Sequence, residues 1–259
     1  MLAVLSPAKK LDFELRETPF DATRPPLSQH TAELLKTAKA LKTTELARLM
    51  KLSDSLANLN HERFQHFSPK PTLGVNAKQA ALAFAGDTYG GLQATDFDQS
   101  DFSFAQDHLR ILSGLYGVLR PLDMIQPYRL EMGTRLLNPR GKDLYAFWQS
   151  HIASQLNRDF KALHTAPSAS VLINLASTEY FTAVDRRALK ARILTCVFKE
   201  KRDGQTKVIG FFAKKARGMM ARHIVKNRLT EPSGLKDFSS AKYRFQPKLS
   251  TADEWVFVR

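Results

Sequence analysis

Apolar residues occur partly as short continuous runs and partly at helical spacing along this chain, a mixture typical of an α/β protein. The apolar runs at residues 1–5, 171–175 and 255–258 predict buried strands, and the spacing over 29–60 predicts helix. Residues 80–86 fit either a strand or a buried turn of helix, which "GDTYGGL" then ends as a turn. No internal repeat is present. The pattern therefore predicts one mixed α/β (α+β) domain over residues 1–259, with a central sheet flanked by helices.

Residues 103–125 have the outline of two short helices joined by a tight turn. Ser103 and Gln106 have the spacing of a capping box for a helix over 103–113, and "GLYG" at 114–117 then interrupts the pattern. This outline is that of a helix-hairpin-helix, whose glycine amides can approach a DNA phosphate closely. The glycines lie further apart than that motif requires, and an ordinary helix end followed by a turn fits equally well. The candidate DNA contacts here are Arg110, Gly114, Leu115, Tyr116, Gly117 and Arg120.

The last quarter of the chain predicts a hairpin followed by a long cationic helix. "RILTCVFKE" and "TKVIGFF" read as paired strands with Asp203 and Gly204 at the turn. In the helix predicted over 211–228, one apolar stripe is flanked by cations, and no acid is present for pairing along the helix. Gly218 leaves the backbone open between the cationic groups. The stripe consists of Ala213, Ala216, Met220 and Ile224.

The excess positive charge of the chain is concentrated in the region that contains this helix. The formal net charge is +14, and residues 186–259 hold 19 Lys and Arg against 6 Asp and Glu, whereas residues 1–185 hold 20 against 19. Such asymmetry favours a polyanionic partner, because phosphate oxygens would neutralise cations that otherwise repel one another. The alternative is a surface helix whose cations pair with acids from elsewhere in the fold. The candidate DNA contacts in this region are Lys199, Lys201, Lys214, Lys215, Arg217, Arg222 and Lys226.

Two further segments place polar side chains where α/β proteins often bind ligands. Asn174, Glu179 and Tyr180 lie at a predicted strand end and the start of the helix that Ser177 can cap, and "PYRLEMGTR" adds Glu131. If the segments meet, Glu131 and Glu179 would suit acid–base catalysis, with Asn174 and Tyr180 orienting a substrate. Capping and buried ion pairs explain the same residues without catalysis. Candidate anion-binding residues are Lys9, Lys10, Arg129 and Arg135.

Several classes of protein are excluded by missing motifs. The chain has no phosphate-binding P-loop, no dinucleotide-binding glycine fingerprint and no zinc helix, so neither a cofactor nor a metal is predicted. Its one cysteine, Cys196, lies within an apolar run and predicts an inert buried thiol. No apolar run is long enough to span a membrane, and the first residues do not form a signal peptide, so a cytoplasmic location is expected.

Six segments, taken in order, make the chain resemble the YaaA family of bacterial peroxide stress resistance proteins over essentially its whole length. These segments are "LSPAKKLDF", "AFAGDTYGGL", "LRILSGLYGVLRPLDMIQPYRLEMGTRL", "LYAFW", "INLASTEYF" and "FFAKKARGMMARHIV". The resemblance implies a single cantaloupe-like α/β domain, a positively charged cleft and a helix-hairpin-helix carried by Gly114–Gly117. It also implies binding to double-stranded DNA and a role in limiting damage from hydrogen peroxide and iron.

The leading hypothesis is a non-enzymatic protein that binds double-stranded DNA without reading its sequence. A single buried thiol at Cys196 is poorly suited to destroying peroxide, so protection through DNA binding fits better than peroxidase chemistry. The alternative is an enzyme acting on a nucleobase or nucleotide through Glu131 and Glu179. An RNA partner predicts the same charge, although no aromatic signature of an RNA-binding sheet is present.

Overall fold

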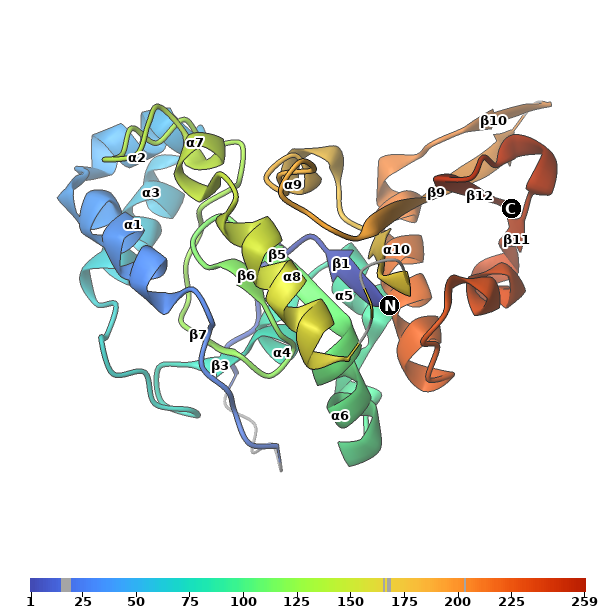
Figure 1. Cartoon of the computed structure of the whole chain (residues 1–259). Helices are drawn as coiled ribbons and strands as arrows, with labels where there is room; N and C mark the ends of the chain where they lie inside the picture. The colour runs from blue at the N-terminus through green and yellow to red at the C-terminus, as the bar shows by residue number, and fades with distance from the viewer. Residues whose placement is uncertain (15–19, 165, 167–168, 203) are drawn as a thin grey trace.

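A central, mostly parallel β-sheet organises the chain into a single α/β domain, as the pattern predicts (Figure 1). The computed structural model describes residues 1–14, 20–164, 166, 169–202 and 204–259. The strand order of the sheet is β11-β12-β9-β8-β1-β5-β6, and β10 pairs with β9 as a hairpin. The strand β1 is buried along its whole length, so both faces of the sheet are covered there. Figure 1 shows α8 lying across β5 and β6, the helices α1–α3 at one end, and the C-terminal segments at the other.

The domain consists of one large sheet, two short two-stranded ladders and the helices around them. The sheet contains β1 (Leu2–Leu5), β5 (Leu109–Ser113), β6 (Gly117–Leu119), β8 (Val171–Asn174), β9 (Arg192–Arg202), β10 (Gln205–Lys207), β11 (Arg244–Phe245) and β12 (Glu254–Val258). Two short ladders pair β2 (Lys10–Leu11) with β4 (Phe84–Ala85) and β3 (Lys78–Gln79) with β7 (Met124–Ile125). The α-helices are α1 (Ser28–Ala40), α2 (Thr43–Met50), α3 (Asp54–Gln65), α4 (Ala80–Ala83), α5 (Asp87–Leu92), α6 (Gln99–His108), α7 (Leu144–Trp148), α8 (His151–Ala162), α9 (Thr178–Phe181) and α10 (Gly210–Lys226). The 3-10 turns are η1 (Ala94–Asp96), η3 (Pro232–Asp237), η4 (Ser240–Lys242) and η5 (Pro247–Leu249).

The connections around β1 create a topological switch point. The strand β1 pairs in parallel with β5 on one side and with β8 on the other, and β8 continues in parallel to β9. The chain therefore leaves β1 towards β5 and leaves β8 in the opposite direction, towards β9. Two adjacent strands whose connections diverge leave a crevice at their carboxyl ends, where open α/β sheets usually bind ligands.

Most elements with a strong periodic signal are confirmed. The predicted strands correspond to β1, β8 and β12, the region 29–60 forms the three helices α1, α2 and α3, and the cationic helix is α10. The ambiguous segment 80–86 begins as the helical turn α4 and continues as the short strand β4. The hairpin of β9 and β10 is present, although Asp203 of its turn lies outside the described residues. Its second strand is shorter than predicted, because β10 ends at Lys207 and the end of "TKVIGFF", from Gly210 on, belongs to α10. The predicted apolar stripe of α10 is buried as expected.

The helix-hairpin-helix prediction for residues 103–125 is wrong. The helix α6 starts earlier, at Gln99, and its capping box is formed by Asp98 and Asp101 instead of Ser103 and Gln106. The chain then becomes the fully buried strand β5, turns, and returns antiparallel as β6. Every residue of β5 is buried, and parallel pairing with β1 holds this segment in the extended conformation. Tertiary context has overridden the local helical spacing.

Two glycines, both placed in turns or open backbone by the sequence, instead set the distance between two helices. "GDTYGGL" forms the helix α5, which packs closely against α10. A Cβ atom on Gly218 would lie 1.8 Å from the Thr88 carbonyl oxygen, and one on Gly91 would lie 2.2 Å from that of Lys215. The space beside Gly218 is thus filled by the backbone of Thr88 and is not open to a phosphate, which corrects the interpretation of that glycine.

Candidate functional site

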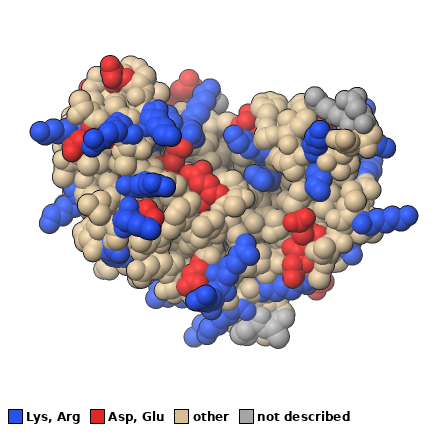
Figure 2. All heavy atoms as spheres, turned by 90° about the horizontal axis from the view of Figure 1, so that it is seen from above, with Lys and Arg blue, Asp and Glu red and all other residues tan. Residues whose placement is uncertain are grey.

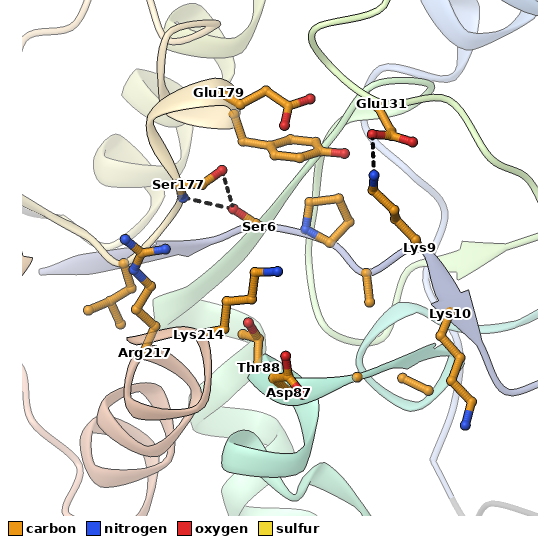
Figure 3. Close-up of a pocket in the computed structure, with 16 residues that line it drawn as sticks. Ser6, Lys9, Lys10, Asp87, Thr88, Glu131, Ser177, Glu179, Lys214 and Arg217 are labelled. Carbon is orange, nitrogen blue, oxygen red and sulfur yellow. Dashed lines mark hydrogen bonds and ion pairs between the residues drawn. The ribbon is translucent and has the colours of Figure 1, made fainter. Parts of the chain in front are cut away.

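A cavity of about 360 Å³ lies at the switch point, at the carboxyl ends of β1 and β8 (Figure 3). Its lining comes from the segments that follow these two strands, from the start of α5, from Glu131, and from α10. The lining residues are Ser6, Pro7, Ala8, Lys9, Lys10, Ala85, Gly86, Asp87, Thr88, Glu131, Leu175, Ser177, Glu179, Tyr180, Lys214 and Arg217. Segments far apart in the sequence therefore converge where the sheet topology predicts a ligand site.

The floor of the cavity is fixed by hydrogen bonds between the two strand ends. The Ser177 backbone N–H donates to Ser6 Oγ at 2.8 Å, and the two hydroxyls lie 3.3 Å apart. The hydroxyl of Tyr89, from α5, donates to the Ser6 carbonyl oxygen at 3.1 Å. These bonds tie β1, β8 and α5 together and leave the serine hydroxyls at the cavity surface (Figure 3).

Glu131 and Glu179 form an acidic wall on one side of the cavity, and their carboxylates differ in how fully they are bonded. The Glu131 carboxylate accepts from Arg129 at 3.0 Å through one oxygen and pairs with Lys9 at 2.7 Å through the other. The Glu179 Oε1 atom accepts from the Gly133 backbone N–H at 3.0 Å, while its second oxygen has no partner among the described residues. Both oxygens of Glu131 are therefore engaged by cations, whereas Glu179 keeps one oxygen available to a ligand.

Tyr180 completes this wall with a buried ring. Burial, supported by the negative charge of Glu179 and Glu131 nearby, raises the pKa of Tyr180 well above its ordinary value. Its hydroxyl is therefore protonated at every physiological pH, so Tyr180 is suited to packing and hydrogen bonding and not to acting as a base.

The opposite wall is cationic and comes from α10. Figure 3 shows the Lys214 side chain extending from this helix into the cavity, with Arg217 one turn further along. Neither side chain forms an ion pair or hydrogen bond within the part of the chain that the structure describes. Burial lowers the pKa of the Arg217 guanidinium from its ordinary value. A partly desolvated cation without a carboxylate partner is stabilised by a bound anion.

The sequence-predicted pocket residues are only partly brought together. Glu131, Glu179 and Tyr180 line the cavity, whereas Asn174 is buried beside it and accepts from the Ala176 backbone N–H. Among the anion-binding candidates, Lys9 and Lys10 line the cavity, and Figure 3 shows Lys10 pointing away from its centre. Arg129 is engaged by Glu131, and Arg135 is exposed outside the lining.

The predicted contacts around "GLYG" lie inside the protein. Gly114, Leu115, Tyr116 and Gly117 are buried, and a Cβ atom on Gly114 would lie 2.3 Å from the Leu130 carbonyl oxygen. Arg110 is buried and pairs with Asp159 at 2.7 Å. Arg120 reaches Asp123 at 3.4 Å. These residues hold the core and the turn after β6, so the expectation that their backbone approaches a phosphate is corrected.

The cations in the C-terminal half of α10 pair with acids from two places, the turn η1 that precedes α6 and the first turn of α6. Arg222 donates to the Gln93 carbonyl oxygen at 2.9 Å and lies 3.5 Å from the Asp96 carboxylate. Lys226 and Arg228 both pair with the buried Asp101. For Arg222 and Lys226 the alternative interpretation, pairing with acids from elsewhere in the fold, is therefore confirmed.

The remaining predicted cations lie at the surface of the C-terminal region. Lys201, Lys214 and Lys215 are exposed, and Lys199 is half-buried on β9. Lys207, on β10, is also exposed. None of these five lysines has an ion-pair partner among the residues described. From above, cations lie on both sides of a hollow in which acidic side chains are also exposed (Figure 2).

The described residues contain no reactive thiol, no group of metal ligands and no membrane-spanning helix. Cys196 is buried, and burial raises the pKa of its thiol to about 12, so it is not a reactive thiolate. Within the described residues no group of three or more His, Cys, Asp or Glu side chains is placed to hold a metal ion. In the same part of the chain, no helix has the length and apolarity needed to cross a bilayer.

Comparison with known proteins supplies the family. The model of the family described as "Peroxide stress protein YaaA" matches residues 1–249. The chain belongs to the YaaA peroxide stress protein family. Similar relatives share the description UPF0246 protein: one from Caulobacter vibrioides is 53% identical over 259 residues, covering all of this chain and 99% of the relative. One from Magnetococcus marinus is 54% identical with the same coverage, and one from Phenylobacterium zucineum is 51% identical, with 95% of the relative covered.

Several lining residues were missed by sequence reasoning. Ser6 follows β1, and Asp87 and Thr88 begin α5. Their spacing in the sequence does not indicate a common site, because they meet only through the packing of the sheet and the helix. A usable signal was present at β1, since "SPAKK" directly follows a buried strand and strand ends of parallel sheets gather ligand residues.

Proposed function

We propose that this protein acts in the bacterial response to peroxide by binding the phosphate backbone of double-stranded DNA without reading its sequence. The supporting observation is a set of exposed lysines that have no acidic partner within the described part of the chain and lie in a region of strong positive charge. Lys201 and Lys207 lie on the β9–β10 hairpin, and Lys214 and Lys215 lie on the helix that directly follows it. Phosphate oxygens would neutralise such cations and release counterions.

The description of the family as a peroxide stress protein supports the setting. The buried Cys196 thiol argues against direct peroxide chemistry, since only a thiolate attacks peroxide readily. Protection would follow from occupancy of the DNA surface.

Fluorescence anisotropy with a labelled duplex, repeated across a salt series, tests this proposal. We expect a log–log slope of roughly −0.9 per phosphate neutralised. The double variant Lys214→Gln/Lys215→Gln is expected to weaken binding and to flatten the slope by about two, at about one per lysine. The charge-matched control Lys51→Gln/Lys70→Gln changes two exposed lysines remote in sequence from this region. No duplex binding at low salt, or equal losses in both double variants, contradicts the proposal.

A second candidate, an enzyme acting on a nucleobase or nucleotide, is favoured by the convergence of Glu131, Glu179 and Tyr180 on one cavity at the switch point. The two acids would not be equivalent. Glu131 is held by Arg129 and Lys9, so Glu179 is the carboxylate left to act on a proton. Turnover assays on nucleosides and nucleotides, with Glu179→Gln as the inactive variant, test this candidate. Turnover that survives in Glu179→Gln removes Glu179 from the chemistry.

A further inference from the structure

The two walls of the cavity carry opposite charge, which restricts the ligands that fit. Lys214 and Arg217 face it from α10, and Glu131 and Glu179 face it from the other side (Figure 3). Asp87 lines it as well, at the start of α5. A simple polyanion such as a duplex backbone would meet carboxylates in this cavity, and a simple cation would meet α10. The complementary ligand has an anionic group at one end and N–H donors at the other.

We infer that the cavity binds a nucleoside 5′-monophosphate, with its phosphate on the cationic wall and its base on the acidic wall. This inference rests on the second candidate of the proposed function and names the ligand of that site. The phosphate would pair with Lys214 and with Arg217, the partly desolvated guanidinium for which the described residues supply no carboxylate. Both cations lie on consecutive turns of one helix, so they face the same group.

The base would be recognised by Glu179. Its Oε1 atom is fixed by the Gly133 N–H, which leaves the other oxygen to accept a ring N–H or an amino group of the base. Glu131 is already bonded to Arg129 and Lys9, which offset its charge and occupy its oxygens, so Glu179 is the acceptor that this wall offers to a base. The Tyr180 ring supplies apolar surface in the same wall.

The size and the hydroxyl groups of the cavity favour a nucleotide over a free amino acid, which also carries both charges. At about 360 Å³ the cavity lies within the range of pockets that bind drug-sized molecules and exceeds the needs of an amino acid. The Ser6 and Ser177 hydroxyls lie between the two walls at the strand ends, where ribose hydroxyls would need partners (Figure 3).

Isothermal titration calorimetry on the full chain tests this assignment. The ligands are the ribonucleoside 5′-monophosphates, the matching nucleosides, inorganic phosphate, and glycine and glutamate. We expect at least one monophosphate to bind about tenfold or more tightly than phosphate or its own nucleoside, because each half adds a charge-assisted hydrogen bond. Monophosphates that bind no better than phosphate, or an amino acid that binds more tightly than any of them, overturn the assignment.

Variants then separate the two walls. Glu179→Gln keeps an acceptor for the Gly133 N–H and should lose about tenfold in monophosphate affinity while phosphate affinity is kept. Arg217→Met should lose affinity for both ligands. Lys248→Met, an exposed lysine on η5, is the control that should change neither. Thermal melting of each variant verifies folding. A Glu179→Gln protein that melts like wild type and binds monophosphates equally well also overturns the assignment.

The same proteins, titrated with duplex, distinguish this inference from DNA binding. Glu179→Gln should bind duplex like wild type, because a carboxylate does not contact phosphate. Monophosphate binding without duplex binding contradicts only the DNA proposal, and duplex binding without monophosphate binding contradicts only this inference. Neither readout requires turnover.

Discussion

The two halves of α10 have similar composition and opposite electrostatic surroundings. In the N-terminal half, Lys214, Lys215 and Arg217 have no acidic partner among the described residues. In the C-terminal half, Arg222 lies beside Asp96, and Lys226 is bound by Asp101. The difference arises from η1 and α6, which place Asp96 and Asp101 beside the C-terminal half of the helix only. The helix α10 is therefore not a single electrostatic unit, because acids from the fold pair with the cations of one half and, within the described residues, not with those of the other.

Gly218, at the boundary between the halves, gives the largest expected effect. Gly218→Ala would place a methyl group against the Thr88 backbone, which no rotamer change can relieve, so we expect a loss of about 3 kcal/mol in the free energy of unfolding. Urea denaturation measures this loss. Gly90→Ala, on α5 with open space around it, is the control and should stay within about 1 kcal/mol of wild type. Equal behaviour of the two variants contradicts the close packing of α5 and α10.

Asp101 gives the next largest effect and adds a pH dependence. Burial favours the protonated form, but hydrogen bonds from Lys226, Arg228 and the Asp98 backbone together hold the pKa of Asp101 below its ordinary value of 3.8. Its stabilisation is therefore complete above the unfolded pKa and is lost as the pH falls through the lower folded pKa. Asp101→Asn should cost about 2 kcal/mol at pH 7 and weaken the fall in stability below pH 4.

Asp107→Asn provides the matched comparison, since Asp107 is an exposed acid on the same helix. Urea denaturation across pH 3–7 should leave that variant close to wild type. An Asp101→Asn protein with the stability and acid sensitivity of Asp107→Asn would show that the C-terminal half of α10 is not held by this carboxylate.

Duplex binding sharpens the comparison between the halves. Lys214→Gln/Lys215→Gln should lower duplex affinity by about tenfold at low salt, or about 1.4 kcal/mol. Arg222→Gln/Lys226→Gln removes the same charge but should mainly lower the free energy of unfolding, because these cations already pair with Asp96 and Asp101. Anisotropy and urea denaturation on both proteins should show that the first variant loses mainly duplex affinity and the second mainly stability. Identical losses of affinity would mean that the paired half contacts DNA as well.

Arg217 gives the smallest expected effect, with the opposite sign. Arg217→Met removes a partly desolvated charge that has no partner among the residues described, so the free energy of unfolding should rise by about 0.5–1 kcal/mol. Arg228→Met, which breaks the contact with Asp101, should lower it by a similar amount. Thermal and urea unfolding of the ligand-free proteins provide the measurement. A destabilised Arg217→Met protein would indicate that the guanidinium serves the fold and not an anion.

The parts of the fold that the sequence predicts well are those in which local pattern and environment agree. The strands at 2–5 and 171–174, and the stripe of α10, follow directly from apolar spacing. The prediction failed at 109–113, because pairing with β1 outweighs helical spacing in a fully buried strand. The acidic half of the pocket was named in advance, since Glu131, Glu179 and Tyr180 lie in polar segments. The partners of Arg222 and Lys226 were not named, because Asp96 and Asp101 lie more than a hundred positions earlier in the chain.

The close contact between α5 and α10 also has a consequence for how the site comes into existence. The acidic wall and the strand ends are complete once residue 180 has been added to the growing chain, but the cationic wall belongs to residues 214 and 217. A ribosome-bound chain or a proteolytic fragment that ends before α10 thus lacks half of the cavity and exposes the α5 surface that Gly218 would cover. The complete cavity therefore exists only after α10 has been added to the chain and has packed against α5.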